Sequence, residues 1–157
     1  MKPQRRLERG QSLIEMIFII PILLVLVGGA VDVGRAFIIL VAVENAAGEG
    51  ALYGSVNPAC LADDHSDTIC QLSESLNGRI IEEGRPFIDL TEDMIVSNIN
   101  DGDGGATITA GSLLEITVTY TYVPLTPIGH ILWGSEAVVT ATAEQEILSP
   151  PPPGYRY

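Results

Sequence analysis

Two residues near the start of the chain have types and a spacing that could support chemistry. Gly10 is followed by Gln11, and Glu15 stands five positions after the glycine, directly before a long apolar run that begins at Met16. A carboxylate at the edge of a hydrophobic span is costly unless it has a function. The arrangement therefore indicates peptide-bond cleavage between Gly10 and Gln11, and a role for Glu15 in docking or assembly of the helix that follows.

The residues before this peptide bond form a short basic leader. Residues 1–10 contain four basic residues and one acidic residue, a net charge of +3, whereas the rest of the chain contains four basic and nineteen acidic residues, a net charge of −15. Binding to nucleic acid requires a basic patch for the phosphates, so the acidic remainder argues against that function. Solubility is the simplest explanation of the acidity.

The apolar run over residues 13–31 is long enough to cross a lipid bilayer. It has nineteen residues and a single charge, that of Glu15, and a membrane helix needs about 20 apolar residues. Pro21 is tolerated in such a helix when neighbouring groups compensate for the missing hydrogen bond. Because positive charge precedes the span and is scarce after it, the N-terminus is expected in the cytoplasm and the C-terminal domain outside.

Two other interpretations of this segment stay open. In the first, the segment is an ordinary signal-anchor and Glu15 only marks the membrane edge. In the second, a secretory signal peptide is cut after Ala30, because the residues at 28–30 are small enough for signal peptidase. The carboxylate inside the apolar region and the further apolar stretch to Val43 argue against this second interpretation.

The periodicity of the chain predicts an α+β fold. One long helix is expected from about Ser12 to about Tyr53, in the membrane in its first half and packed on the ectodomain in its second. A second, amphipathic helix is expected at about 68–83, because apolar residues recur there every three or four positions. Strands are expected at 94–99, 113–123 and 137–147, with a short apolar loop or helical turn at 128–133. A small antiparallel sheet of three or four strands, covered by a helix on one face, follows.

The clearest alternation of apolar and polar residues in the chain lies in the strand expected at 113–123. One face of this strand is formed by Ile116, Val118, Tyr120 and Tyr122.

The expected organisation has four parts. They are a cytoplasmic leader (1–10), a long N-terminal helix (11–54, membrane-spanning at roughly 13–31), an extracytoplasmic α+β domain (55–148) and a proline-rich tail (149–157).

Two pairs of residues beyond the apolar run could form specific bonds. Asp32 and Arg35 lie three positions apart where the helix is expected to leave the membrane, so they can form a salt bridge on one helix face, or else set a register or partner contact. Cys60 and Cys70 both follow the span, on the side where a disulfide can persist. A disulfide is favoured over two reduced thiols, and closing so short a loop would contribute about 2–3 kcal/mol.

The other titratable residues do not form a catalytic or metal-binding pattern. Asp101 and Asp103 fit the first two ligand positions of an EF-hand, but the later positions lack the necessary carboxylate, so a solvated turn is favoured over a cation site. His65 and His130 have no nucleophile elbow, phosphate loop or metal spacing beside them. The sequence therefore indicates neither an enzyme nor a cofactor, metal or small-molecule substrate.

A longer pattern begins in the leader and continues past the apolar run. It consists of RRLERGQSLIEMIFIIPILLVLVGGAVDVGRAF (residues 5–37) followed by VENAAGEGALYGS (residues 43–55). This pattern resembles, most strongly over residues 9–54, the N-terminus of TadE-like proteins, which are minor pseudopilins of the tight-adherence (Flp-type) pilus system. A looser similarity continues through the valine- and threonine-rich strand, the VPLTPIGHILWG stretch and the closing strand rich in alanine and threonine.

The resemblance implies cleavage between Gly10 and Gln11 by a prepilin peptidase, with Glu15 as the fifth mature residue. In pilins that glutamate is thought to neutralise the N-terminal amine of a neighbouring subunit, where opposite charges offset each other's desolvation. Met16 departs from the family, since many members have an aromatic residue there. The implied partners are the membrane, the peptidase, other pilins or pseudopilins and the pilus assembly platform.

The resemblance also implies a location and leaves one alternative. A single-pass protein of the cytoplasmic membrane is expected, which reaches the extracellular pilus after assembly and supports surface adhesion. The alternative is a membrane-anchored extracytoplasmic binding module that is not incorporated in a pilus. In that case the helix is only an anchor and Glu15 is dispensable.

Overall fold

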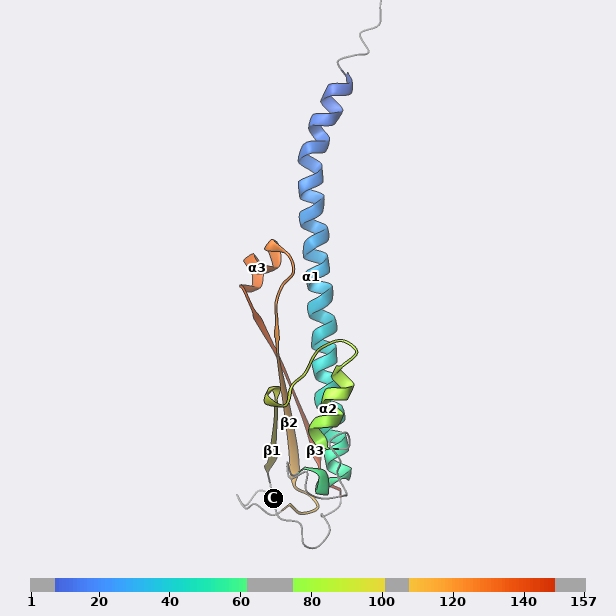
Figure 1. Ribbon diagram of the computed structural model, residues 1–157, viewed down its shortest axis with the longest axis vertical. Helices are drawn as coiled ribbons and strands as arrows, with labels where there is room; N and C mark the ends of the chain where they lie inside the picture. Colours follow the sequence, from blue (N-terminus) through green and yellow to red (C-terminus); the bar gives the residue numbers. More distant parts are fainter. Residues whose placement is uncertain (1–7, 62–74, 101–107, 149–157) are drawn as a thin grey trace, which may run out of the picture. The chain divides into compact units, whose positions relative to one another are not determined.

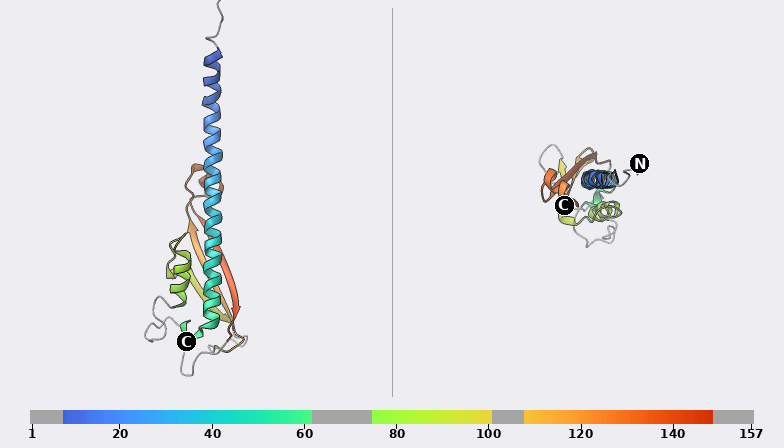
Figure 2. Two further views of the ribbon diagram at one scale, coloured as in Figure 1. Left: turned by 90° about the vertical axis from the view of Figure 1, so that its right-hand side faces the viewer. Right: turned by 90° about the horizontal axis from the view of Figure 1, so that it is seen from above.

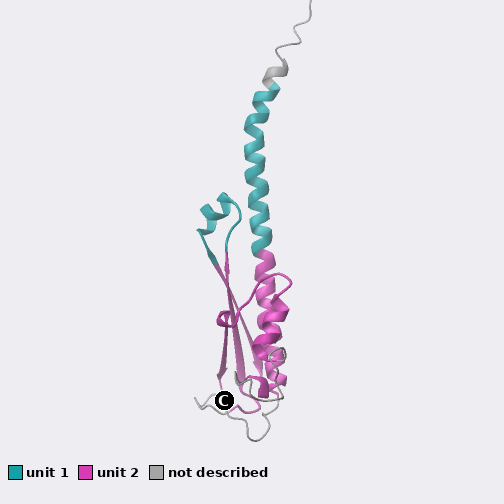
Figure 3. Cartoon of the chain, in the orientation of Figure 1, with its two compact units in different colours: residues 1–36, 123–137 teal, residues 37–122, 138–157 magenta. Residues whose placement is uncertain are grey.

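The computed structural model describes residues 8–61, 75–100 and 108–148 (Figure 1). The elements in chain order are α1 (Glu8–Val56), η1 (Pro58–Cys60), α2 (Leu76–Gly84), η2 (Glu92–Met94), β1 (Ile95–Asn100), β2 (Leu113–Tyr122), α3 (Pro127–Trp133) and β3 (Ala137–Glu146). This confirms the predicted α+β class, with a sheet of three strands. The chain divides into two compact units, of which unit 1 contains residues 1–36 and 123–137 and unit 2 contains residues 37–122 and 138–157 (Figure 3).

Helix α1 has 49 residues and includes Pro21, as the apolar and helix-compatible sequence predicted. In its unit 1 part, the large apolar side chains from Leu13 to Val27 each expose 47–69% of their surface. The helix is long and apolar enough to cross a membrane. A membrane-spanning helix satisfies its backbone hydrogen bonds internally and has apolar side chains on its outer surface, and this part of α1 is helical with exposed apolar side chains.

The unit 2 part of α1 has a different pattern, with one buried stripe. Its buried apolar residues recur at intervals of three and four positions, which defines a single packed helix face. They are Ile39, Ala42, Val43, Ala46, Ala47 and Ala51. Within unit 2, α1 and α2 lie side by side on the same side of the sheet (Figure 2). Most members of the stripe are alanines, so the helix can approach its neighbours closely.

The antiparallel sheet has the order β1-β2-β3. Residues Ile95 to Asn100 pair with Val118 to Leu113 in register. On β2, the side chains of Leu114, Ile116 and Val118 are fully buried and Tyr122 is 2% exposed, with Tyr120 half-buried, so the predicted face of this strand is confirmed. The opposite face is polar, and threonine hydroxyls meet there across β2 and β3, at 3.1 Å between Thr117 and Thr142.

Helix α2 begins later than the sequence predicted. Ser75 has an extended backbone (φ −68°, ψ 156°) and its hydroxyl accepts a hydrogen bond from the backbone N–H of Gly78 at 3.1 Å, so it caps a helix that starts at Leu76. The predicted start near Thr68 is therefore wrong for this helix, while its end at Gly84 agrees. The buried residues Leu76 and Ile80 belong to the predicted apolar stripe. Residues 62–74, 101–107 and 149–157 lie outside the described part of the chain.

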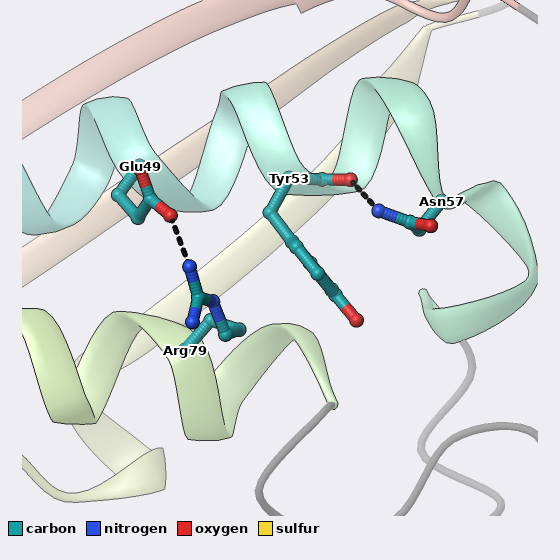
Figure 4. A network of polar contacts seen from close by, with 4 residues as sticks. All are labelled: Glu49, Tyr53, Asn57 and Arg79. Carbon is teal, nitrogen blue, oxygen red and sulfur yellow. Dashed lines mark hydrogen bonds and ion pairs between the residues drawn. The ribbon is translucent and has the colours of Figure 1, made fainter.

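A polar contact links α1 and α2 within unit 2 (Figure 4). Arg79 Nη2 donates to Glu49 Oε1 at 2.7 Å, and the guanidinium lies 5.5 Å from the centre of the Tyr53 ring. The hydrogen bond and the charge of Glu49 raise the pKa of Arg79 above its ordinary value. Both side chains remain partly exposed, so water screens the pair and its main effect is to favour one register of the two helices.

Gly50 provides a direct test of the close packing in unit 2. A Cβ atom at this position would lie 2.5 Å from Ile80 Cγ1 and 2.6 Å from Ile80 Cδ1, and Ile80 is itself fully buried. We expect Gly50→Ala to lower the thermal unfolding temperature, because overpacking costs about 1–3 kcal/mol and outweighs a helix-propensity gain of about 1 kcal/mol. Circular dichroism of the full chain in detergent micelles measures the change.

Gly48→Ala is the matched control for this substitution. An added Cβ at Gly48 meets nothing within 4 Å, so only the gain in helix propensity remains. We expect Gly48→Ala to raise the unfolding temperature slightly. Equal behaviour of the two variants would contradict the packing of α1 on α2 described here.

Candidate functional site

The residues predicted to support processing and assembly all lie on α1. Gly10 and Gln11 are within the helical backbone that starts at Glu8. The side chain of Glu15 is exposed, at the start of the exposed apolar segment. Cleavage between Gly10 and Gln11 and the assembly role of Glu15 stay predictions.

A second site forms around Asp32, which is fully buried in unit 1. Asp32 Oδ1 accepts a hydrogen bond from the backbone N–H of Leu125 at 2.9 Å. Asp32 Oδ2 accepts one from the backbone N–H of Thr126 at 3.1 Å and another from the Thr126 hydroxyl at 2.5 Å. Hydrogen bonds to an ionised carboxylate are short and strong, and they offset the desolvation of a buried charge. One side chain of α1 thus holds the segment that leads into α3.

Thr126 connects this carboxylate to the start of α3. Its hydroxyl donates to Asp32 and accepts a hydrogen bond from the backbone N–H of Gly129 at 3.2 Å, so it is the N-cap of the helix. Pro127 occupies the first helical position, where its missing N–H is harmless. Because Asp32 fixes the rotamer of the Thr126 hydroxyl, the carboxylate also determines where α3 begins.

Two glycines permit the close approach of these segments within unit 1. A Cβ at Gly129 would collide with Asp32 Oδ2 and would lie 2.6 Å from Pro124 Cβ. A Cβ at Gly28 would lie 3.2 Å from Thr126 Cγ2. Beside these contacts runs an apolar groove, lined by Leu24, Val25, Gly28, Thr126, Pro127 and Ile128. The loop therefore lies directly against residues 24–32 of α1.

Sequence reasoning singled out Asp32 but paired it with its near neighbour on the helix. Arg35 is exposed, and its predicted salt bridge with Asp32 stays a prediction. The described partners of the Asp32 carboxylate lie 93 and 94 positions away along the chain, where no local periodicity could indicate them. The available signals were indirect: a carboxylate at the end of an apolar run and a Thr-Pro pair that is typical of a helix start.

The other predicted site residues are described only in part. Cys60 is buried (7% exposed), whereas Cys70 lies outside the described residues, so the disulfide between them stays a prediction. Asp101, Asp103 and His65 also lie outside the described residues. His130 is exposed on α3, with its Nδ1 3.3 Å from the carbonyl oxygen of Gly134. Within the described ranges, no group of three or more His, Cys, Asp or Glu residues is placed to hold a metal ion.

Residues 10–52 match the TadE-like protein family. This chain carries a TadE-like domain. The domain coincides with most of α1 and includes Gly10, Glu15 and Asp32. The segment held by Asp32, at residues 125 and 126, lies outside the match. No curated protein and no solved structure matches the chain.

Proposed function

We propose that the chain is a minor pseudopilin of a tight-adherence (Flp-type) pilus. In this proposal a prepilin peptidase removes residues 1–10 on the cytoplasmic side, and the mature protein enters the pilus, or primes it, through α1. The observation that carries the proposal is the coincidence of the TadE-like domain with α1, an uninterrupted helix whose first half is apolar and exposed.

The first half of α1 is suited to two successive environments. Its large apolar side chains are exposed on all faces from Leu13 to Val27, so lipid or a bundle of similar helices could cover them. In the membrane they face acyl chains, and in a pilus they would face the helices of neighbouring subunits. The single carboxylate of this stretch, Glu15, would pair with the amine of Gln11 of an adjacent subunit, because an ionised carboxylate inside such a bundle requires a partner.

Unit 2 would then be the extracytoplasmic part of the subunit. We propose a single-pass topology with the N-terminus in the cytoplasm, based on the basic leader and the acidic remainder of the chain. Unit 2 would support assembly contacts or surface adhesion and have no catalytic role. Other pilins, pseudopilins and the assembly platform are the proposed partners.

The proposal predicts peptidase-dependent processing. Membrane-extracted protein, expressed with its cognate prepilin peptidase, is expected to begin at Gln11, and the same protein without the peptidase is expected to keep its leader. N-terminal sequencing and intact mass measure both. Gly10→Leu should block cleavage because a bulky side chain would occupy the position before the scissile bond.

Two results would contradict the proposal in different ways. An intact leader in the presence of active peptidase would favour the membrane-anchored binding module. A start at Val31 would instead identify a secreted protein whose signal peptide is cut after Ala30.

A further inference from the structure

The segment that precedes and forms α3 exposes an unusual amount of apolar surface. Over residues 123–133 the large apolar side chains with the greatest exposure are Val123 (53%), Leu125 (68%), Ile131 (81%), Leu132 (65%) and Trp133 (39%). The segment contains one titratable side chain, that of His130. A short segment with this many exposed apolar side chains and so few polar ones is typical of an interaction surface.

The place where this segment is attached suggests what covers it. Thr126 contacts α1 at Gly28 and Asp32, and the groove beside it is lined by Leu24 and Val25. Leu24, Val25 and Gly28 belong to the last turns of the apolar stretch that is long enough to cross a membrane. Asp32 belongs to the first helical turn after that stretch. Figure 3 shows this part of α1 and the segment in one colour, as parts of unit 1. The apolar patch therefore lies beside the outer end of the proposed span.

Several backbone N–H groups of the segment also have hydrogen-bond acceptors within the protein, as a medium with little water requires. Lipid does not hydrogen-bond to exposed N–H groups, so irregular backbone near it needs internal acceptors. Asp32 accepts from the N–H groups of Leu125 and Thr126, and the Thr126 hydroxyl accepts from Gly129 N–H. Where water is scarce, a carboxylate that accepts from these backbone donors supplies the hydrogen bonds that water would otherwise provide.

We propose that residues 123–133 form a second membrane-contacting element, which inserts its apolar side chains into the interfacial region of the lipid bilayer beside the outer end of α1. Short apolar segments lie in this region with their polar groups satisfied or facing water. Trp133 stands at the end of α3, and tryptophan is enriched at the level of the lipid headgroups. The inference requires that α1 spans a membrane, and it does not depend on incorporation into a pilus.

This element would give the subunit two points of attachment to the bilayer. Asp32 is already buried between α1 and the loop, and lipid around residues 123–133 would further protect its hydrogen bonds to Leu125 and Thr126 from competing water. Extraction of the subunit from the membrane would then have to withdraw residues 123–133 as well as α1.

Trp133 makes this proposal directly measurable, because it is the only tryptophan in the chain. The full-length protein is reconstituted into phosphatidylcholine/phosphatidylglycerol vesicles, with or without bromine on the acyl chains near the headgroups. Trp133 is expected to emit at a blue-shifted wavelength, to lose most of its emission in the brominated vesicles, and to resist quenching by aqueous iodide.

Two relocated tryptophans calibrate the result. Trp133→Phe combined with Phe18→Trp places the fluorophore within the proposed span, where lipids brominated near the acyl-chain ends should quench it. Trp133→Phe combined with Val96→Trp places it on the exposed side of β1, where iodide should quench it and brominated lipid should not.

Three quenching results would contradict the proposed membrane contact of residues 123–133. Quenching of Trp133 by iodide but not by brominated lipid, with Phe18→Trp quenched by lipid, overturns this proposal and leaves the span intact. Protection of Trp133 from both quenchers, lost as the protein is diluted in the vesicles, also overturns it and assigns the surface to a second copy. Failure of brominated lipid to quench either position overturns both the span and the proposal.

Discussion

Glu15→Gln is expected to abolish incorporation of the subunit into the pilus while leaving cleavage after Gly10 intact. The amide keeps the size of the side chain but removes the charge that would neutralise the amine of Gln11 in a neighbouring subunit. Leaving one member of a buried ion pair without its partner costs about 3–5 kcal/mol, which corresponds to roughly a hundredfold loss or more in the assembly equilibrium. Immunoblots of sheared pili and of membranes measure the distribution.

Glu44→Gln is the matched control for this prediction, because it removes a carboxylate from an exposed position of the same helix. We expect Glu44→Gln to be incorporated normally. Normal incorporation of Glu15→Gln would contradict the proposed pairing and favour a helix that acts only as an anchor. Loss of cleavage in Glu15→Gln would assign the residue to recognition by the peptidase instead.

The elements of the fold that were predictable are those with a strong local period. The apolar run of α1 and the alternation of β2 each specify an element without help from distant residues, and both were predicted within a few positions of their observed ends. The start of α2 was not, because several residues in that region can cap a helix. Ser75 is the cap observed, and the buried contacts of Leu76 and Ile80 explain why a helix starting there is stabilised.

The site around Asp32 shows where local patterns stop being sufficient. A carboxylate three positions before an arginine indicates a helix salt bridge, which is a contact between neighbours. The carboxylate also accepts hydrogen bonds from a segment more than ninety positions later, between β2 and β3, and this contact depends on the path of the chain and not on local spacing. Gly28 was considered in the sequence as a small residue near a possible signal-peptidase site, and the structure identifies Thr126 as the residue that approaches it.

Asp32→Ala is expected to release residues 123–133 from α1. The substitution would leave the N–H groups of Leu125 and Thr126 without their acceptor and would remove the group that orients the Thr126 hydroxyl. A donor left without its acceptor costs about 1–3 kcal/mol, and because these two N–H groups are part-buried, the amide protons of Leu125 and Thr126 should together report a loss of about 30-fold in protection. Hydrogen exchange of the full chain in detergent micelles measures this loss.

Arg35→Ala distinguishes two roles of Asp32, which are attachment of the loop at residues 125 and 126 and the predicted salt bridge with Arg35. If the carboxylate acts mainly on the loop, Arg35→Ala should leave the protection of Leu125 and Thr126 close to that of the unmodified protein, and only Asp32→Ala should remove it. If the two variants lose protection equally, the pair on the helix is what holds Asp32 in place and the loop depends on that pair. Unchanged protection in Asp32→Ala would mean that packing of Thr126 on Gly28 is sufficient, and the carboxylate would then have no part in attaching the loop.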